Sequence, residues 1–268
     1  MKTIIVPTDF SPAADAAVAY AGGLATVSGS SVLLLRVYQL PVTMNDFPVL
    51  MVPADDLKTV VDSGLSKVKA EAQKKFSAIN FETESRLGDV REEIEVIIKE
   101  QDIFCIVTGT QKLSGVENFL QGNDAMALLK NSPQPVVAVP EGSTATTPKN
   151  IVLAVDNTVV DEIPAQKIFS FVTALKAQLH IVHVQTDDEE IPTSQQSLAK
   201  LFTPLSITYH AVKSNDVTEG IKTYLLESGA DLLMLLPHKH NLYERLFFKG
   251  HTAEIVGEVS LPVVCINA

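Results

Sequence analysis

The residue types best suited to chemistry lie between positions 109 and 123, where the sequence GTQKLSGVENFLQGN contains three glycines. This stretch follows an apolar run at 103–107, which is typical of a buried strand, and precedes residues 124–130, which favour a helix. Glycine lets a ligand approach the backbone, and the free N–H groups at a helix N-terminus favour an anion. The pattern therefore indicates a loop suited to phosphate, although an ordinary strand-to-helix turn uses glycine for the same conformational reason.

Familiar catalytic arrangements are missing from the sequence. No GxxxxGK[ST] motif occurs, which excludes a P-loop ATPase. Asp9 and Asp156 are single carboxylates, whereas a phospho-receiver needs an acidic pair beside a further aspartate. The segment TDF at 8–10 offers neither the histidine motif of a nucleotidyltransferase nor the phosphate loop of a flavodoxin. Because no nucleophile–base pair or general acid is recognisable either, the sequence predicts a protein that is not an enzyme.

All six histidines lie in the second half of the chain. His183, His238 and His240 are candidates to gather near Asp156, and a set of this kind suits zinc. Their spacing is not that of a compact metal motif, however. The pattern favours loop and surface positions for the histidines, so no metal ligand is predicted.

Composition and charge narrow the function classes further. The chain has 268 residues, 46% of them hydrophobic and 20% charged, which is typical of a globular protein with a substantial core. The net charge of −11 is spread evenly, with 13 basic against 18 acidic residues up to Lys149 and 8 against 14 after it. Even acidity argues against nucleic-acid and anionic-membrane partners, because both require a basic patch.

The lack of a recognisable targeting signal and the positions of the two cysteines both bear on the cellular compartment. The three consecutive apolar residues at 4–6 are too few for a signal peptide, and no run is long enough to span a bilayer. Cys105 and Cys265 lie in apolar, strand-like runs, which favours buried free thiols over a disulfide. The sequence therefore predicts a cytoplasmic protein.

Strand-like and helix-like segments alternate along the chain. Ser11 and Pro12 suit the N-cap and first position of a helix at 13–25, and Asp89 suits the N-cap of a later one. Alternation of this kind, with continuous apolar strands, predicts a parallel sheet that is covered by helices on both faces. The predicted strands of the first half lie at 3–6, 32–37, 81–86, 103–107 and 135–139.

The second half repeats the first. IVLAVD at 151–156 matches IIVPTD at 4–9 with an offset of 147, and from Asp216, which matches Asp89, the offset is 127. The two offsets show that the later half lacks a segment between its second strand and its third helix. The polar stretch EGSTATTPK at 141–149 is typical of a linker. We therefore expect two domains of one type, residues 1–140 and 150–268.

Five strands in each repeat predict an α/β fold with two doubly wound parallel sheets of order 3-2-1-4-5. Ligands bind such sheets beyond the carboxyl ends of the strands, where the strand order reverses, and Asp9 and the glycine loop both flank that crevice. The last strands, 135–139 and 262–266, are apolar edges that need to be covered. We expect them to pair antiparallel, which gives an intramolecular pseudo-dimer and leaves open whether the whole chain forms a homodimer.

These features resemble the universal stress protein family over essentially the whole chain, as a tandem pair. The resemblance rests on VPTDFS at 6–11, RV at 36–37, the glycine loop, and PVV near the end of each half. It implies a fold like the adenine nucleotide alpha hydrolases, a non-enzymatic stress-response role, and an ATP or AMP site in the first repeat. The aspartate then faces the base, the end of the second strand contacts it, and the loop holds ribose and phosphates. Transferred to this chain, the site consists of Pro7, Thr8, Asp9, Val37, Gly109, Lys112, Gly122 and Asn123.

Two positions depart from the family loop, which reads G-x-x-G, nine residues, then G-[S/T]. Lys112 replaces the middle glycine and adds a positive charge, whereas Asn123 replaces the hydroxyl residue and retains an amide donor. In the second repeat Leu236 stands in place of Gly109, and no nucleotide is expected there. The alternative is a nucleotide-free interaction scaffold with an unknown protein partner. The apolar stretch 40–52 would then be either its docking surface or simply a cover over the end of the sheet.

Overall fold

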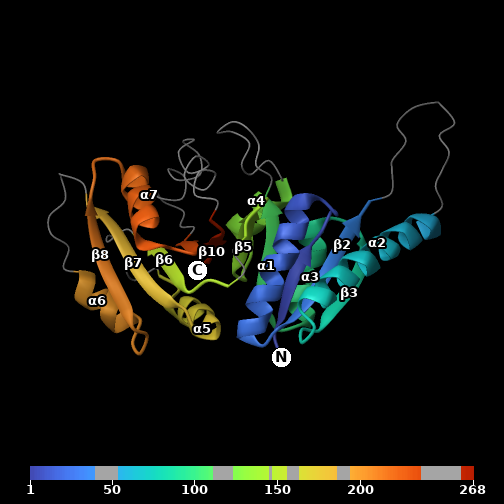
Figure 1. Cartoon of the computed structure of the whole chain (residues 1–268), viewed down its shortest axis with the longest axis horizontal. Coiled ribbons are helices and arrows are strands. Elements are labelled where there is room, and N and C mark those ends of the chain that lie inside the picture. The colour runs from blue at the N-terminus through green and yellow to red at the C-terminus, as the bar shows by residue number, and fades with distance from the viewer. Residues whose placement is uncertain (40–53, 111–122, 145–146, 156–162, 186–193, 237–260) are drawn as a thin grey trace.

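A computed structural model of the chain describes residues 1–39, 54–110, 123–144, 147–155, 163–185, 194–236 and 261–268. Its strands and helices alternate and form two units, called here the first copy and the second copy (Figure 1). The first copy contains β1 (Thr3–Pro7), α1 (Pro12–Ser28), β2 (Ser31–Tyr38), α2 (Ala54–Lys75), β3 (Phe81–Leu87), α3 (Val90–Glu100), β4 (Ile103–Thr110), α4 (Asn123–Asn131) and β5 (Val136–Pro140). The second copy contains β6 (Asn150–Ala154), α5 (Ala165–Leu175), β7 (Gln178–Gln185), α6 (Ser194–Leu201), β8 (Ile207–Lys213), α7 (Val217–Ser228), β9 (Leu232–Leu235) and β10 (Val263–Cys265).

The strands form one 10-stranded sheet of order β3-β2-β1-β4-β5-β10-β9-β6-β7-β8. Neighbours within each copy are parallel, whereas β5 and β10 are antiparallel, with Val264 opposite Val137. The predicted order 3-2-1-4-5 is therefore confirmed in both copies, as is their pairing through the last strands. This junction covers two apolar strands that would otherwise be open edges of the sheet.

One strand extends further than the sequence predicts, and the extension affects the candidate site. β4 continues to Thr110, and its last two residues pair with Val139 and Pro140 of β5. Gly109 therefore lies within a strand, so the prediction that it opens the loop was wrong. The ladder to β5 decides this, because the pairing with β5 continues over three residues beyond the predicted end of the strand at 107.

The helices begin where the capping residues predict. The hydroxyl of Ser11 accepts a hydrogen bond from the N–H of Ala14, and the carboxylate of Asp89 accepts hydrogen bonds at the start of α3. Between the second and third strands, α6 has 8 residues where α2 has 22. Within the part of the chain that the structure describes, no helix is both long and apolar enough to cross a membrane.

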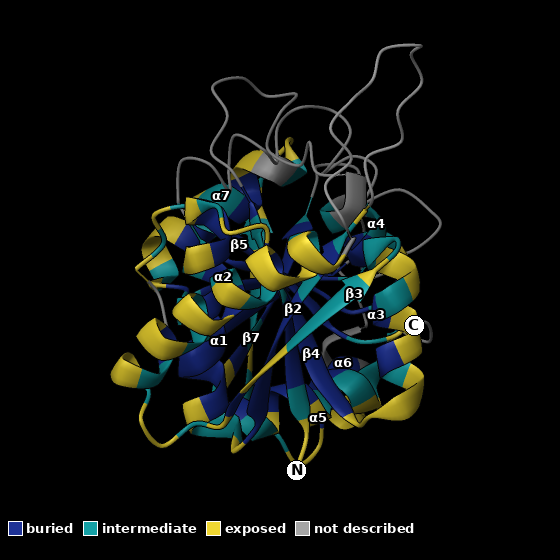
Figure 2. Cartoon of the chain, turned by 90° about the vertical axis from the view of Figure 1, so that its right-hand side faces the viewer, coloured by how far each residue is buried: buried dark blue, intermediate teal, exposed yellow. Residues whose placement is uncertain are grey.

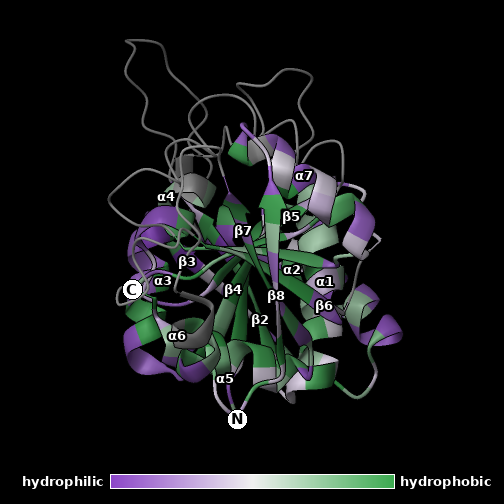
Figure 3. Ribbon diagram, turned by 90° about the vertical axis from the view of Figure 1, so that its left-hand side faces the viewer, coloured by the Kyte–Doolittle hydropathy of each residue, from purple (hydrophilic) through white to green (hydrophobic). Residues whose placement is uncertain are grey.

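Two hydrophobic cores, one on each face of the sheet, run through both copies. Helices α1, α2, α5 and α6 cover one face, and α3, α4 and α7 cover the other. The strands are mostly buried and hydrophobic between helices with exposed outer faces (Figures 2 and 3). Phe104 of β4 stacks on Phe171 of α5 with ring centroids 5.4 Å apart, so the first core continues across the junction. Cys105 and Cys265 are free and buried, as predicted.

Polar contacts also join the copies. The side-chain amide of Asn267 donates hydrogen bonds to the carbonyls of Leu129 and Ser132, at 3.2 and 2.9 Å. The ammonium of Lys167 on α5 donates in turn to the backbone carbonyl of Asn267, at 2.8 Å. Residues of the second copy thus satisfy carbonyls at the C-terminal end of α4, which have no partner within that helix.

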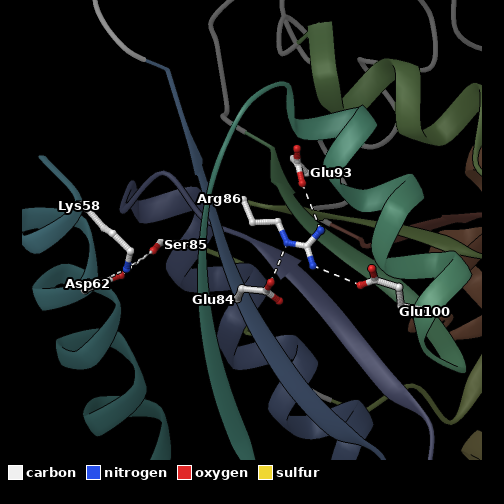
Figure 4. A network of polar contacts seen from close by, with 7 residues as sticks. All are labelled: Lys58, Asp62, Glu84, Ser85, Arg86, Glu93 and Glu100. Atoms are coloured by element: carbon white, nitrogen blue, oxygen red, sulfur yellow. Dashed lines mark hydrogen bonds and ion pairs between the residues drawn. The ribbon is translucent and has the colours of Figure 1, made fainter. Parts of the chain in front are cut away.

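The outer edge of the first copy is held by an ion-pair network (Figure 4). The guanidinium of Arg86 on β3 contacts three carboxylates, those of Glu84, Glu93 and Glu100, at 2.7, 3.1 and 3.4 Å. Glu93 and Glu100 belong to α3, so Arg86 fastens this helix to the edge strand. Beside it, the hydroxyl of Ser85 donates to Asp62 of α2 at 2.6 Å.

Candidate functional site

The turn between β1 and α1 is held by its own polar groups. The N–H of Thr8 donates to the carbonyl of Leu35 on β2 at 2.9 Å, and the Thr8 hydroxyl accepts from the N–H of Phe10 at 3.1 Å. Oδ1 of Asp9 accepts from the N–H of Ser11 at 2.9 Å. Phe10 has a φ of 66°, a left-handed conformation that is uncommon for a bulky residue. The turn is thereby fixed, with Asp9 exposed at its tip.

Arg36 on β2 contacts this turn through its guanidinium group. Its guanidinium donates to the carbonyl of Thr8 at 3.2 Å, and it lies 5.5 Å from the centroid of the Phe10 ring. Burial raises the pKa of Asp9, but the hydrogen bonds from Ser11 and the charge of Arg36 outweigh it. The pKa of Asp9 is therefore lowered, and the carboxylate is ionised at neutral pH.

Gly109 is a glycine because α1 packs against it. A Cβ at this position would collide with the carbonyl of Ala13 and lie 2.8 Å from the backbone nitrogen of Ala14. The sequence argument was that the missing Cβ leaves room for a ligand, but in this structure the first turn of α1 takes that room. Gly109 therefore positions α1, and with it the turn that carries Asp9, beside the end of β4.

The structure brings together some of the predicted site residues but describes only part of the set. Pro7, Thr8 and Asp9 form the end of β1 and the turn after it, and Gly109 lies near the end of the neighbouring strand β4, against the first turn of α1. Val37 is buried on β2, on the other side of β1. Asn123 begins α4, and nothing of its side chain is described. Lys112 and Gly122 lie outside the described residues, as does the stretch 40–52.

Sequence analysis did not single out Arg36 or Phe10 as functional. Arg36 is part of the RV pair at the end of the second strand, but the sequence does not show that its side chain reaches back to Thr8. A left-handed conformation is least expected at an aromatic residue, so Phe10 carries no turn signal. The internal repeat does draw attention to Arg36. Its equivalent at the offset of 147 is His183, and both are polar residues within a buried strand.

The corresponding corner of the second copy is built differently. His183 is buried, and its Nδ1 donates to the carbonyl of Val155 at 3.3 Å. Leu236, at the position of Gly109, packs against the hydrophobic core. Helix α5 begins only at Ala165, after Pro164, which provides no side-chain cap. The described part of this corner thus lacks the capped helix start that accompanies Gly109.

The proposed grouping of histidines falls mostly outside the described residues. His238, His240 and Asp156 lie there, and the ring of His183 faces the carbonyl of Val155. Among the residues that the structure describes, no three His, Cys, Asp or Glu side chains gather as a metal site requires.

A different pair of histidines meets on the outer strands of the second copy. The rings of His180 on β7 and His210 on β8 stack with centroids 6.0 Å apart, and the ring of Tyr224 on α7 lies 4.9 Å from His210. Nδ1 of His180 is 2.9 Å from the hydroxyl of Thr208. Burial and the charge of His210 lower the pKa of His180.

Comparisons with known proteins agree with this architecture. A universal stress protein from Archaeoglobus fulgidus DSM 4304 is 19% identical, with 99% of this chain and 98% of that chain covered and a TM-score of 0.69. A functionally unknown protein from Pseudomonas aeruginosa PAO1 is 14% identical, with 100% and 92% covered and a TM-score of 0.55. At these identities the likeness shows the fold alone. No curated protein matches the chain.

Family membership follows from the sequence of the first copy. The model of the universal stress protein family matches residues 1–140, which is more than half of the chain. The second copy has the same strand order, and the whole chain is similar in fold to a universal stress protein. The chain therefore belongs to the universal stress protein family, with two such folds in tandem.

Proposed function

We propose that the chain binds one adenine nucleotide, ATP or AMP, in its first copy and acts as a non-enzymatic sensor in a stress response. The base would lie near Asp9 and the backbone of Val37, and the phosphates near Gly122, Lys112 and Asn123. The two copies would act as separate domains, residues 1–140 and 150–268, of which the second carries no nucleotide.

The observation that carries the proposal is the position and charge of Asp9. It lies at the carboxyl end of β1, where the strand order reverses between β1 and β4, and this is where doubly wound sheets bind ligands. An ionised carboxylate accepts hydrogen bonds only, which suits the amino group of adenine. Gly109 adds no independent support, because the packing of α1 already explains it.

Isothermal titration calorimetry with ATP and AMP tests the proposal. We expect at most one site per chain, because the second copy has Lys249 where the loop of the first has Gly122. Asp9→Asn and Gly122→Val should each weaken binding at least tenfold, which corresponds to about 1.4 kcal/mol. Asp156→Asn is the matched control in the second copy and should leave the affinity unchanged.

Two results would contradict the proposal. Binding of two nucleotides per chain would show that the second copy is also a site. A protein that binds neither ATP nor AMP, and releases no nucleotide when denatured, would favour the nucleotide-free scaffold.

A further inference from the structure

Arg36 is anchored at two points of the β1–α1 turn. Its guanidinium donates to the carbonyl of Thr8 at 3.2 Å and lies 5.5 Å from the centroid of the Phe10 ring. The Phe10 ring is itself wedged against α2, since a Cβ on Gly64 would lie 2.7 Å from its tip. Planar guanidinium groups combine a directional hydrogen bond with stacking, which lysine does not. The side chain therefore connects the peptide that precedes Asp9 to β2 and α2.

The second copy makes the same connection with a different side chain. At the offset of 147, Arg36 corresponds to His183 and Thr8 to Val155. Nδ1 of His183 is 3.3 Å from the carbonyl of Val155. Because a carbonyl oxygen only accepts hydrogen bonds, Nδ1 carries the proton here. Two unlike side chains thus bond to the same backbone atom, the carbonyl of the residue before the aspartate.

The backbone beneath this contact is also the same in both copies. The N–H of Thr8 donates to Leu35 at 2.9 Å, and the N–H of Val155 donates to Val182 at 3.0 Å. Thr8 and Val155 each follow the last paired residue of their strand. In both residues the N–H donates to the backbone of the second strand, and the carbonyl accepts from a side chain. In each copy, the residue that precedes the aspartate is thereby held at both its N–H and its carbonyl.

We propose that Arg36 is a positioning residue, which orients Asp9 for the adenine base by holding the carbonyl of Thr8. This inference rests on the proposed nucleotide site of the first copy. A carboxylate that is already aligned loses less conformational freedom when a ligand binds, so the affinity is higher. Without the contact from Arg36, the peptide between Thr8 and Asp9 loses one of its restraints, and Asp9 also loses a nearby positive charge.

The first experiment needs no nucleotide. The carboxyl ¹³C resonance of Asp9 is titrated in the wild type and in Arg36→Leu, which keeps an apolar side chain on the strand but removes the donor and the charge. We expect the pKa of Asp9 to rise in the variant, and the amide of Phe10 to exchange its hydrogen faster. An unchanged pKa together with an unchanged exchange rate would overturn the positioning role of Arg36.

The second experiment measures the affinity for ATP by calorimetry between pH 4 and 8. Arg36→Leu should weaken binding about tenfold, since a hydrogen bond to a charged group is lost, and the acidic limb of the pH profile should move to higher pH. Arg36→His imitates the second copy, retains the donor and should restore most of the affinity. His183→Leu is the matched control and should leave the affinity for ATP unchanged.

The two experiments fail in different ways. If the wild type binds no ATP, the proposed function falls, while the titration of Asp9 still decides whether Arg36 positions that residue. If the wild type binds ATP and Arg36→Leu binds it equally well, the inference is wrong and the proposed function stands. Equal losses in Arg36→Leu and His183→Leu would show a general effect on folding and would also overturn the inference.

Discussion

The two copies differ most at the corner where the first strand, the first helix and the fourth strand meet. Helix α1 begins at Pro12, directly after the turn, and packs against Gly109. At the offset of 147, α5 would begin at residue 159, but it begins at Ala165. Both helices end at equivalent residues, Ser28 and Leu175. Ile163 and Pro164, which are equivalent to Ala16 and Ala17 of α1, therefore lie outside the helix in the second copy, and residues 156–162 are not among the described residues.

This difference shows that one glycine and one helix start depend on each other. A Cβ at Gly109 would collide with the backbone of Ala13, so a helix that begins at Pro12 requires glycine on β4. In the second copy that position is Leu236, which packs against the hydrophobic core. The strand order is the same in both copies although this residue differs.

The outer strands differ in their chemistry as well. In the first copy, Arg86 binds three carboxylates between β3 and α3. In the second copy, the same face carries His180, His210 and Tyr224 between β7, β8 and α7. One cluster is built on ion pairs, whereas the other contains His180, whose pKa is held below its ordinary value by burial and the charge of His210.

The largest predicted effect concerns the strand pair that the copies share. Val137 is fully buried opposite Val264, so Val137→Asp places an unpaired charge in the centre of the 10-stranded sheet. We expect a loss of about 4 kcal/mol or more in the free energy of unfolding. Urea unfolding measures this loss, and hydrogen exchange of β5 and β10 locates it. Val60→Asp on the exposed side of α2 is the control and should change little. Unchanged protection of β10 in Val137→Asp would contradict the shared strand pair.

The next effect tests the link between Gly109 and α1. Gly109→Ala should cost about 3 kcal/mol, because the new methyl group meets rigid backbone and not a flexible side chain. Hydrogen exchange should increase at the start of α1 and remain unchanged in α5. Leu236→Ala is the matched change in the second copy, and it should cost about 1 kcal/mol through lost packing without affecting α1. A Gly109→Ala variant as stable as the wild type would disprove the link.

The sequence predicted the fold well because its signals are regular. Continuous apolar strands, the caps Ser11 and Asp89 and the internal repeat all agree, and together they predict the strand order and the pairing of the copies. The candidate site was harder to predict because it depends on contacts between distant residues. The reach of Arg36 to Thr8, 28 positions away, leaves no periodic pattern. The packing of α1 on Gly109 is marked in the sequence only by the glycine itself, and that glycine was interpreted as part of a ligand-binding loop.

The smallest predicted effect is a loss of stability at low pH in β7, β8 and α7 of the second copy that β3 and α3 of the first copy do not share. His180 is partly buried, and burial together with the charge of His210 holds its pKa below the ordinary value of 6.5. The side chains that meet the His180–His210 pair are Thr208 from β8, at Nδ1 of His180, and Tyr224 from α7.

The unfolded chain accepts a proton on His180 more readily than the folded chain does. The contribution of His180 to stability is therefore complete above about pH 6.5 and is lost as the pH falls through the lower folded-state pKa. Because His180 is only partly buried, solvent screening limits the loss to about 0.5 kcal/mol.

Hydrogen exchange at pH 7.5 and pH 5 measures this loss separately in each copy. Tryptophan fluorescence cannot do so, because the chain has no tryptophan. We expect β7, β8 and α7 to lose protection at pH 5, while β3 and α3 keep theirs. His180→Leu copies Leu33, its equivalent at the offset of 147, and should abolish the loss in the second copy because no proton can then be taken up there. The same loss of protection in His180→Leu would show that the pH dependence arises elsewhere, and the chemical difference between the outer layers would then have no effect on stability.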